Sequence, residues 1–258
     1  MTRIAIIAAL PGELKPLVRG WQHERHLSVD LWRTQHNNVE YFAACGGMGK
    51  LSAAKAFSKI EWIAAGGGQL ENTRDAWEKS AKLDMVISAG WAGALRTDFE
   101  AGKAYRAAGV IDIQTGERYA AAGASGTDPW LVTSPRVATA AEKRRLVAEY
   151  GAGLVDMEAA AIARLAAMRG IPFQCIKGVS DGFNENLPNF NRFISPDGQL
   201  RIPRLLFFVL PRPWFWPALI RMGENSKKAS HSLAGLLLEN LNCPGDHSNT
   251  DGDSNLSR

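Results

Sequence analysis

The sequence has few cysteines and histidines, and neither kind forms a cluster. The three cysteines, Cys45, Cys175 and Cys243, lie far apart and make no CxxC pair. Cys45 and Cys175 stand in apolar, strand-like runs, which favours reduced, buried thiols and a cytosolic protein. The five histidines form no HxH or HxxxH pattern, so a metal site is not expected.

Long apolar runs and a strong charge imbalance are also missing. The apolar stretch at 205–217 is interrupted by three prolines and by Arg212. A spanning helix needs roughly 20 apolar residues, so a transmembrane helix is not expected. The net charge of +4 is modest, which argues against nucleic-acid binding. The segment from Met1 runs into a strand-like stretch and shows no signal-peptide pattern.

The rest of the composition is that of ordinary globular material. The chain has 258 residues, of which 46% are hydrophobic and 22% charged. This length fits one large α/β domain or two small ones.

Strand-like and helical segments alternate along most of the chain. The predicted strands cover residues 4–10, 85–89, 104–113 and 171–179. The predicted helices cover residues 11–19, 51–65, 140–150 and an acidic segment at 155–163. A hairpin is expected at 28–45 with its turn at Asn37-Asn38, a polar connection at 66–81, and a loop or hairpin at 114–130. This alternation predicts an α/β fold with a central sheet.

Two carboxylates flank the predicted strand at 171–179. Asp181, in the segment Ser180-Asp181-Gly182, follows the strand, and Glu158 lies in the acidic segment before it. Ligands of open α/β sheets bind beyond the carboxyl ends of strands, so both side chains are expected at one ligand. The alternatives are a turn or cap role for Asp181 and a helix-start role for Glu158. Asp156 is interpreted as a cap or a solvent-facing residue.

Four segments, in a fixed order, carry a family resemblance. They are I-A-I-I-A-A-L-P-G-E-L (4–14), G-G-M-G-K-L-S-A-A-K-A (46–56), V-I-S-A-G-W-A-G-A-L (86–95), and V-D-M-E-A-A-A-I-A through V-S-D-G (155–182). On these segments the chain resembles the purine nucleosidase and nucleoside phosphorylase family, closest to the methylthioadenosine/S-adenosylhomocysteine nucleosidases. The resemblance implies a mixed α/β sheet flanked by helices in a catalytic domain over 1–199, and a homodimer or larger homo-oligomer.

The resemblance also implies residue roles in cleaving the N-ribosidic bond of a purine nucleoside. Asp181 is expected to protonate the purine at N7, Glu13 to orient and deprotonate water, and Glu158 to bind the ribose hydroxyls. The acid must be protonated near neutral pH, which burial at a strand end favours. Alternatively, Glu13 could simply be an acidic residue at the start of a helix. The other residues expected at the substrate are Met157, Gly49, Gly90, Trp91, Ala92, Gly93, Ser180 and Phe183.

The sequence departs from the family pattern in two places. Trp91 stands where the nucleosidases commonly have a small hydroxyl residue. The segment before the acidic helix lacks the aromatic residue that commonly stacks on adenine, and Phe183 or Trp91 is the expected substitute.

Glu13 also bears on the choice of nucleophile. Phosphorylases of this superfamily hold phosphate with arginines on the early loop, where this chain has Glu13 and no arginine before Arg19. A carboxylate repels phosphate and suits water, so the expected reaction is cofactor-free hydrolysis of a 5′-modified adenosine. Arg96 and Arg136 keep phosphorolysis as an alternative. A non-catalytic nucleoside-binding protein is a further alternative.

Residues 200–241 form an expected helical extension rich in proline and aromatic side chains. Its sequence, with S-P-D-G at 195–198 and L-P-R-P-W-F-W-P-A-L-I-R-M at 210–222, resembles the tail of hopanoid-associated nucleoside phosphorylases. This resemblance implies an alternative substrate, a lipid-linked nucleoside of the adenosylhopane type. Residues 242–258 are small and polar and are expected to be disordered.

The aromatic residues of this extension have two interpretations. Residues 205–222 would suit a membrane surface or a lipid, because Trp214, Phe215 and Trp216 lie there between Arg212 and Arg221. The same side chains could equally pack against the core or against another subunit.

Overall fold

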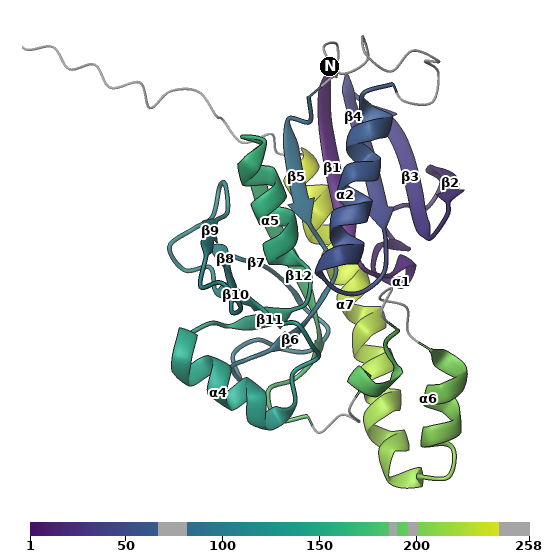
Figure 1. Cartoon of the computed structure of the whole chain (residues 1–258), viewed down its shortest axis with the longest axis vertical. Helices are drawn as coiled ribbons and strands as arrows, with labels where there is room; N and C mark the ends of the chain where they lie inside the picture. The colour runs from purple at the N-terminus through teal and green to yellow at the C-terminus, as the bar shows by residue number, and fades with distance from the viewer. Residues whose placement is uncertain (67–81, 186–189, 196–200, 243–258) are drawn as a thin grey trace, which may run out of the picture.

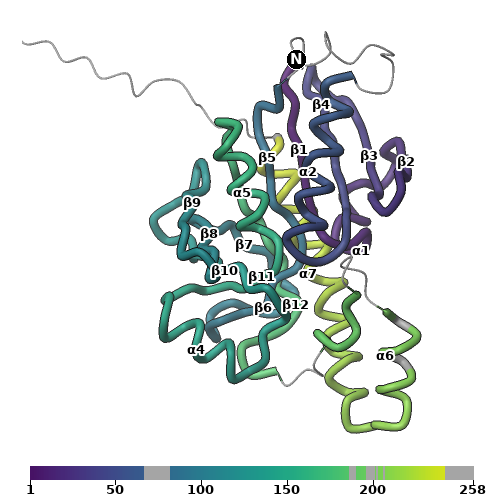
Figure 2. The backbone as a smooth tube through the Cα atoms, viewed as in Figure 1, coloured from purple at the N-terminus to yellow at the C-terminus, as the bar shows by residue number. Residues whose placement is uncertain are grey.

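A computed structural model describes residues 1–66, 82–185, 190–195 and 201–242 and has a mixed α/β fold (Figures 1 and 2). The strands of the described residues join in the order β2-β3-β4-β1-β5-β12-β6-β11-β10-β8-β9, and β7 pairs with β12. The strands are β1 (Thr2–Ala8), β2 (Gln22–His26), β3 (Val29–His36), β4 (Val39–Cys45), β5 (Met85–Ser88), β6 (Trp91–Ala94), β7 (Ala104–Arg106), β8 (Gly109–Asp112), β9 (Arg118–Ala120), β10 (Trp130–Thr133), β11 (Leu154–Asp156) and β12 (Phe173–Asp181). The helices are α1 (Pro11–Leu14), α2 (Lys50–Ala64), α4 (Ala140–Tyr150), α5 (Ala159–Met168), α6 (Ile202–Val209) and α7 (Trp216–Asn242), with short 3-10 turns η1 (Phe190–Phe193) and η2 (Pro213–Phe215).

Strand β1 shows how helices cover both faces of the sheet. It pairs in parallel with β4 and β5, and its side chains alternate between two buried clusters. Ala5 and Ile7 pack with residues of α2 and α5, while Ile6 and Ala8 pack with residues of α1 and α7. A strand buried on both faces has a continuous apolar sequence, which is why this segment was recognisable.

The predicted hairpin at 28–45 is confirmed. Strands β3 and β4 pair antiparallel around Asn37 and Asn38, whose φ angles are 45° and 61°. Positive φ at both turn residues matches the right-handed twist of the strands, and asparagine tolerates it. Strand β2 was not predicted, because its five residues are all exposed and polar at the edge of the sheet.

The prediction of one strand at 104–113 is wrong, since the chain forms β7 and β8 there. The Ala107 N–H donates to Cys175 O in β12, whereas the next N–H, of Ala108, donates to Pro129 O. The backbone therefore changes partner strand between two adjacent alanines. Within 114–130, β9 pairs antiparallel with β8, which confirms the hairpin alternative.

Two predicted helices are shorter than expected. The acidic segment starts as a strand, because Leu154–Asp156 pairs with β10 and β6, and helix α5 begins only at Ala159. Helix α1 ends at Leu14 instead of residue 19. Pro16 has no N–H to continue α1, and the Gly12 carbonyl accepts a hydrogen bond from Ser230 Oγ instead.

The C-terminal extension is helical, as predicted. The second half of α7 packs against β12, with Leu233 and Leu237 fully buried. Helix α6, η2 and the first turns of α7 project beyond the sheet (Figure 1). No helix within the residues that the structure describes is long and apolar enough to cross a membrane. The expectations for 67–81 and 243–258 lie outside the described residues.

Candidate active site

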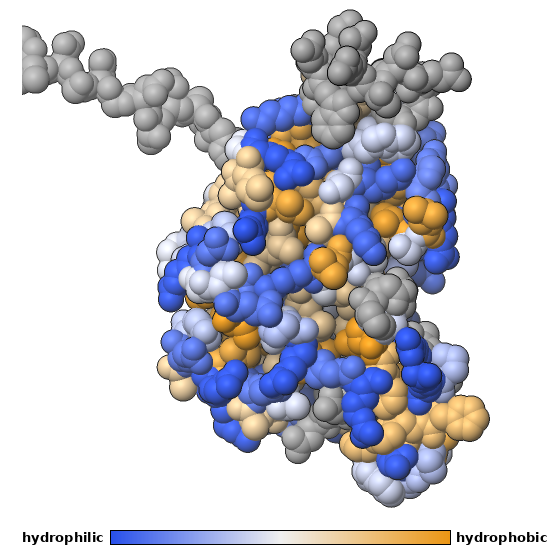
Figure 3. Space-filling model, viewed as in Figure 1, coloured by the Kyte–Doolittle hydropathy of each residue, from blue (hydrophilic) through white to orange (hydrophobic). Residues whose placement is uncertain are grey.

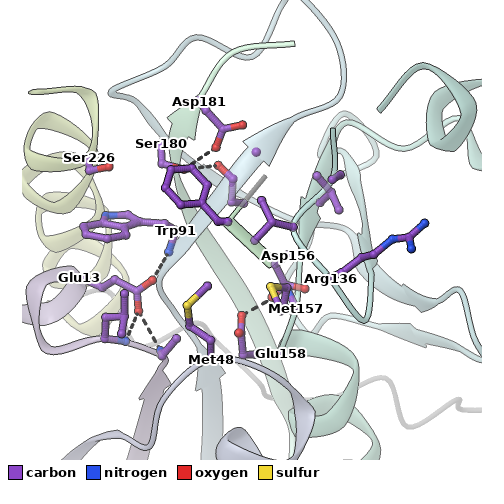
Figure 4. A pocket seen from close by; sticks show the side chains of 18 of the residues that line it. Glu13, Met48, Trp91, Arg136, Asp156, Met157, Glu158, Ser180, Asp181 and Ser226 are labelled. Carbon is purple, nitrogen blue, oxygen red and sulfur yellow. Dashed lines mark hydrogen bonds between the residues drawn. The ribbon is translucent and has the colours of Figure 1, made fainter. Parts of the chain in front are cut away.

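Several strands and loops end at one pocket, shown in Figure 4. Glu13 follows β1, Trp91 begins β6 just after β5, Glu158 follows β11, and Asp181 ends β12. This is the edge of an α/β sheet at which ligands bind. The pocket is lined by Ala9, Leu10, Glu13, Met48, Trp91, Ala92, Gly93, Arg136, Val137, Ala138, Lys143, Val155, Asp156, Met157, Glu158, Ser180, Asp181, Phe190, Met222 and Ser226.

The Glu13 carboxylate is held by three backbone N–H groups. Its Oε2 accepts from Ala9 and Leu10, each at 2.8 Å, and its Oε1 accepts from Trp91 at 2.9 Å. Burial raises the pKa of Glu13, and the hydrogen bonds from Leu10 and Trp91 partly oppose the rise. Because a carboxylate has about four lone-pair sites, one site remains, on Oε1.

Two glycines allow this close arrangement. Gly90 has φ of +118°, and a Cβ there would lie 2.9 Å from Glu13 Oε2. A Cβ at Gly93 would lie 3.1 Å from Asp181 Oδ2. Any larger residue would displace a carboxylate in each case.

A fully buried ion pair lies beside the glutamates. Lys177 Nζ lies 3.0 Å from Asp156 Oδ2 and donates to Ala89 O at 2.9 Å. Asp156 also accepts from Thr133 Oγ1 and from the Ala159 N–H. Asp156 therefore binds the first N–H of α5, although Glu158 is the N-cap residue, and the solvent-facing alternative is wrong. Burial acts to lower the pKa of Lys177, but the charges of Asp156, Cys175 and Glu158 and the hydrogen bond to Asp156 together outweigh it, so the pKa is raised.

Glu158 is buried next to this pair. Its Oε1 accepts from the Gly49 N–H at 2.6 Å, and its Oε2 accepts from the Met157 N–H at 3.2 Å. Burial, followed by the charge of Asp156, raises the pKa of Glu158 to about 8. The carboxyl is therefore largely protonated at neutral pH, and each of its oxygens has room for one further hydrogen bond.

Asp181 lies opposite, with a serine and a lysine as partners. Ser180 Oγ donates to Asp181 Oδ1 at 2.7 Å. Lys143 Nζ donates to Asp181 Oδ2 at 2.5 Å and to Gly182 O at 2.7 Å. Nothing in the sequence near Lys143, in a charged helix far from Asp181, signalled this contact.

Most of the residues predicted from the sequence come together here. Asp181, Glu13, Glu158, Met157, Trp91, Ala92, Gly93 and Ser180 line the pocket. Gly49 and Gly90 lie just behind it, against Glu158 and Glu13. Phe183 is not among the lining residues, whereas Phe190 of η1 is. Reasoning from the sequence also missed Met48, Met222 and Ser226.

Trp91 is turned toward the C-terminal helix. Its Nε1 donates to Ser230 Oγ of α7 at 3.0 Å. A Cβ at Gly12 would lie 3.5 Å from the indole, so the ring lies between α1 and α7. Figure 4 shows the ring on the α7 side of the pocket, with the Trp91 backbone N–H directed at Glu13.

The fold and this acidic pocket define an α/β protein with a candidate active site at its strand ends. A model of the phosphorylase superfamily matches residues 3–137 and 129–199. The chain therefore belongs to the phosphorylase superfamily, as its sequence segments indicated. No curated protein matches the chain.

Solved structures share this fold. An Arabidopsis thaliana 5′-methylthioadenosine nucleosidase is 16% identical with a TM-score of 0.67, covering 94% of this chain and 95% of its own. A Helicobacter pylori 5′-methylthioadenosine/S-adenosylhomocysteine nucleosidase is 16% identical with a TM-score of 0.64, covering 94% and 98%. A Helicobacter pylori futalosine hydrolase is 14% identical with a TM-score of 0.64, covering 93% and 97%. The mixed sheet predicted from the sequence is thus confirmed.

Proposed function

We propose that this protein hydrolyses the N-ribosidic bond of a purine nucleoside, a 5′-modified adenosine of the methylthioadenosine or S-adenosylhomocysteine type, and releases adenine. The proposal depends on one observation above all. Glu13 reaches the pocket as a buried carboxylate with three of its lone-pair sites filled by backbone N–H groups. The remaining site on Oε1 suits a single water molecule.

Glu13 has the properties of a general base. Its pKa is raised by burial, which makes the carboxylate a stronger base nearer to neutral pH. The three backbone N–H groups fix the orientation of the carboxylate, and they are neutral. Water held at Oε1 would give up a proton to Glu13 as its oxygen bonds to the ribose C1′.

Glu158 would hold the ribose. Its two free hydrogen-bonding sites match two neighbouring hydroxyl groups, which both donate and accept. A carboxyl that carries a proton at neutral pH can donate to one hydroxyl and accept from the other. Met157 lines the pocket beside it and offers apolar contact to the sugar.

Asp181 would serve the departing base. Cleavage leaves the electron pair of the C1′–N9 bond on the purine, which must take up a proton. Asp181 ends β12 at the pocket, fixed on both oxygens by Ser180 and Lys143. Removing this proton donor is expected to lower the rate by about 10²–10⁴-fold.

The charge distribution favours water over phosphate. Glu13 and Glu158 line the pocket, and the nearby ammonium of Lys177 is paired with Asp156. Arg136 also lines the pocket, and its guanidinium pairs with Glu142. Phosphate would thus meet carboxyl groups and cations that already have partners.

The test is release of adenine from methylthioadenosine, S-adenosylhomocysteine and a lipophilic adenosine, with and without phosphate. Activity without phosphate is expected, together with large losses of kcat in Glu13→Gln and Asp181→Asn. Glu239→Gln, on the exposed face of α7, is the matched control. Strict dependence on phosphate, or full activity of Asp181→Asn, would overturn the hydrolytic mechanism.

We also propose that the projecting part of the C-terminal extension, residues 201–222, touches a membrane surface in an otherwise cytoplasmic protein. Five large apolar residues are exposed there: Phe207 (83%), Leu210 (63%), Trp214 (68%), Trp216 (45%) and Ile220 (61%). The segment has four arginines and no acidic residue. In Figure 3 apolar surface shows over this projection. Exposed aromatic side chains among arginines suit an anionic lipid interface.

The same helix reaches the pocket, which bears on the substrate. Met222 and Ser226 of α7 line the pocket, within about two turns of the exposed Ile220. A nucleoside with a long apolar 5′ substituent, such as a lipid-linked adenosine, would place that substituent along this helix. Lipid-linked adenosine is therefore the second candidate substrate.

Vesicle co-sedimentation tests the membrane contact. Binding to phosphatidylglycerol vesicles, weaker binding to phosphatidylcholine vesicles, and loss of both in Phe207→Ser/Trp214→Ser are expected. The control is Met168→Ser/Leu238→Ser, which removes exposed apolar side chains from α5 and the far end of α7. Equal binding by both double variants would show that the extension is not the contact.

Self-association is a separate proposal. Leu51 and Trp62 are 75% and 45% exposed and lie on one face of α2, three turns apart. Apolar residues on an outer helix face suit burial against a second copy. Sedimentation velocity is expected to give a dimer or larger species that Leu51→Ser/Trp62→Ser weakens.

A further inference from the structure

Asp181 has a buried cationic partner that the proposed chemistry has not used. The Lys143 side chain is 2% exposed and that of Asp181 13% exposed, and both residues line the pocket. Lys143 comes from the inner face of α4, whereas Asp181 ends β12. A buried ammonium is costly without a partner, so the two groups stabilise each other's charged forms.

This contact changes where the proton lies before reaction. An opposite charge within hydrogen-bonding distance favours the ionised carboxylate. An ionised Asp181 has no proton to give, while the ammonium of Lys143 has three. Resting on the proposed function, we infer that Lys143 supplies, through Asp181, the proton that the departing base takes up.

The proton balance is simple. One proton passes from Lys143 Nζ to the Asp181 carboxylate, and the resulting carboxyl group gives a proton to a purine nitrogen as the C1′–N9 bond breaks. The electron pair of that bond goes to the purine. Lys143 is left as a neutral amine, and a solvent proton restores the ammonium after the products leave. Lys143 is thus a positioning residue that also holds the proton.

Lys143 is the cation that contacts Asp181, because the other cations near the pocket are paired with other carboxylates. Lys177 of β12 is paired with Asp156 of β11, and Arg136 is paired with Glu142 in the first turn of α4. Glu185 lies beside Gly182, β6 presents Gly93, and α7 presents uncharged Met222 and Ser226 to the pocket. Among the residues that the structure describes, the one ion pair of Asp181 is with Lys143.

The pH dependence of kcat distinguishes a Lys143 that supplies the proton from a Lys143 that only holds Asp181 in place. In the wild type, the ammonium of Lys143 shares the task of holding the proton with Asp181, which it contacts directly. In Lys143→Met, an isolated carboxyl must carry the proton, so the alkaline limb of kcat is expected to move down by at least about 2 pH units. At neutral pH kcat should fall about 10²-fold or more.

Two further variants sharpen the experiment. Lys143→Gln keeps N–H donors for Asp181 but has no transferable proton, and is expected to behave like Lys143→Met. Lys50→Met removes a comparable lysine–aspartate contact, 2.7 Å from Asp112, outside the pocket, and should leave the pH profile of kcat unchanged. A folded Lys143 variant with the wild-type alkaline limb would overturn the inference, even if kcat fell.

The proposed function and the role of Lys143 can fail separately, and a measurement without turnover adds to the distinction. A wild type that releases no base from any nucleoside would sink the proposed function. An active wild type whose Lys143 variants keep its pH profile would sink this inference alone. Carbon-13 NMR of the Asp181 carboxyl should show a protonation midpoint that rises in Lys143→Met and Lys143→Gln. An unchanged midpoint would show that Lys143 does not control the Asp181 proton.

Discussion

Glu158 is expected to make the stability of the folded protein depend on pH. Burial, and then the charge of Asp156, raise its pKa from 4.5 to about 8. The folded protein therefore keeps a proton that the unfolded chain releases between these values. Stability from this group is fully present below pH 4.5 and is lost as the pH rises through 8.

The magnitude follows from the size of the shift. The difference between 8 and 4.5 is 3.5 pH units, and one unit corresponds to about 1.4 kcal/mol, so the whole effect is on the order of 5 kcal/mol. Between pH 5 and 7 the free energy of unfolding should fall by about 2.5 kcal/mol through this group. Glu158→Gln cannot ionise and should lose this part of the slope. Glu13, whose pKa is also raised, leaves a slope of the same sign.

Urea denaturation at pH 5, 6, 7 and 8 measures the effect. The free energy of unfolding of the wild type should fall steeply across this series, and that of Glu158→Gln less steeply. Glu239→Gln, a change at an exposed site on α7, should follow the wild type. Parallel slopes for the wild type and Glu158→Gln would refute the reasoning, because the buried carboxyl would then titrate as it does in water.

Three further substitutions test the pocket. Lys177→Met leaves Asp156 buried without its cation and should cost about 3–5 kcal/mol in unfolding free energy, measured by urea denaturation; a loss below about 1 kcal/mol would contradict the buried pair. Gly90→Ala places a Cβ against Glu13 at positive φ and should abolish most activity while costing about 1–3 kcal/mol; unchanged kcat would show that the carboxylate can move freely. Trp91→Phe removes the indole hydrogen bond to α7 and should cost about 1 kcal/mol in thermal unfolding, with no loss expected if the ring is held by packing alone.

Local patterns predicted the elements that depend on neighbours in sequence. The apolar run of β1, the Asn37-Asn38 turn and helices α2 and α4 needed little more than periodicity and turn chemistry. The split between β7 and β8 was missed because it depends on a change of partner strand at Ala107 and Ala108. Periodicity in one segment carries no information about which strand lies beside it.

The same division holds for the pocket. Glu158 and Asp181 were predicted because they flank a recognisable strand, and strand ends gather at one edge of a sheet, whereas Glu13 was predicted from the family resemblance. The hydrogen bonds that leave one acceptor site on Glu13 come from backbone groups before α1 and at the start of β6. No sequence pattern specifies that convergence.

The sequence by itself determined the superfamily, the mixed sheet and the three carboxyl residues at its edge, since these depend on residue type and order. Tertiary structure alone decided which groups surround these residues. Lys143 reaches Asp181 across 38 positions, and Asp156 and burial together raise the pKa of Glu158. Charge on a buried group depends on distances to groups on other elements and on exclusion of water, and both exist only in the folded chain.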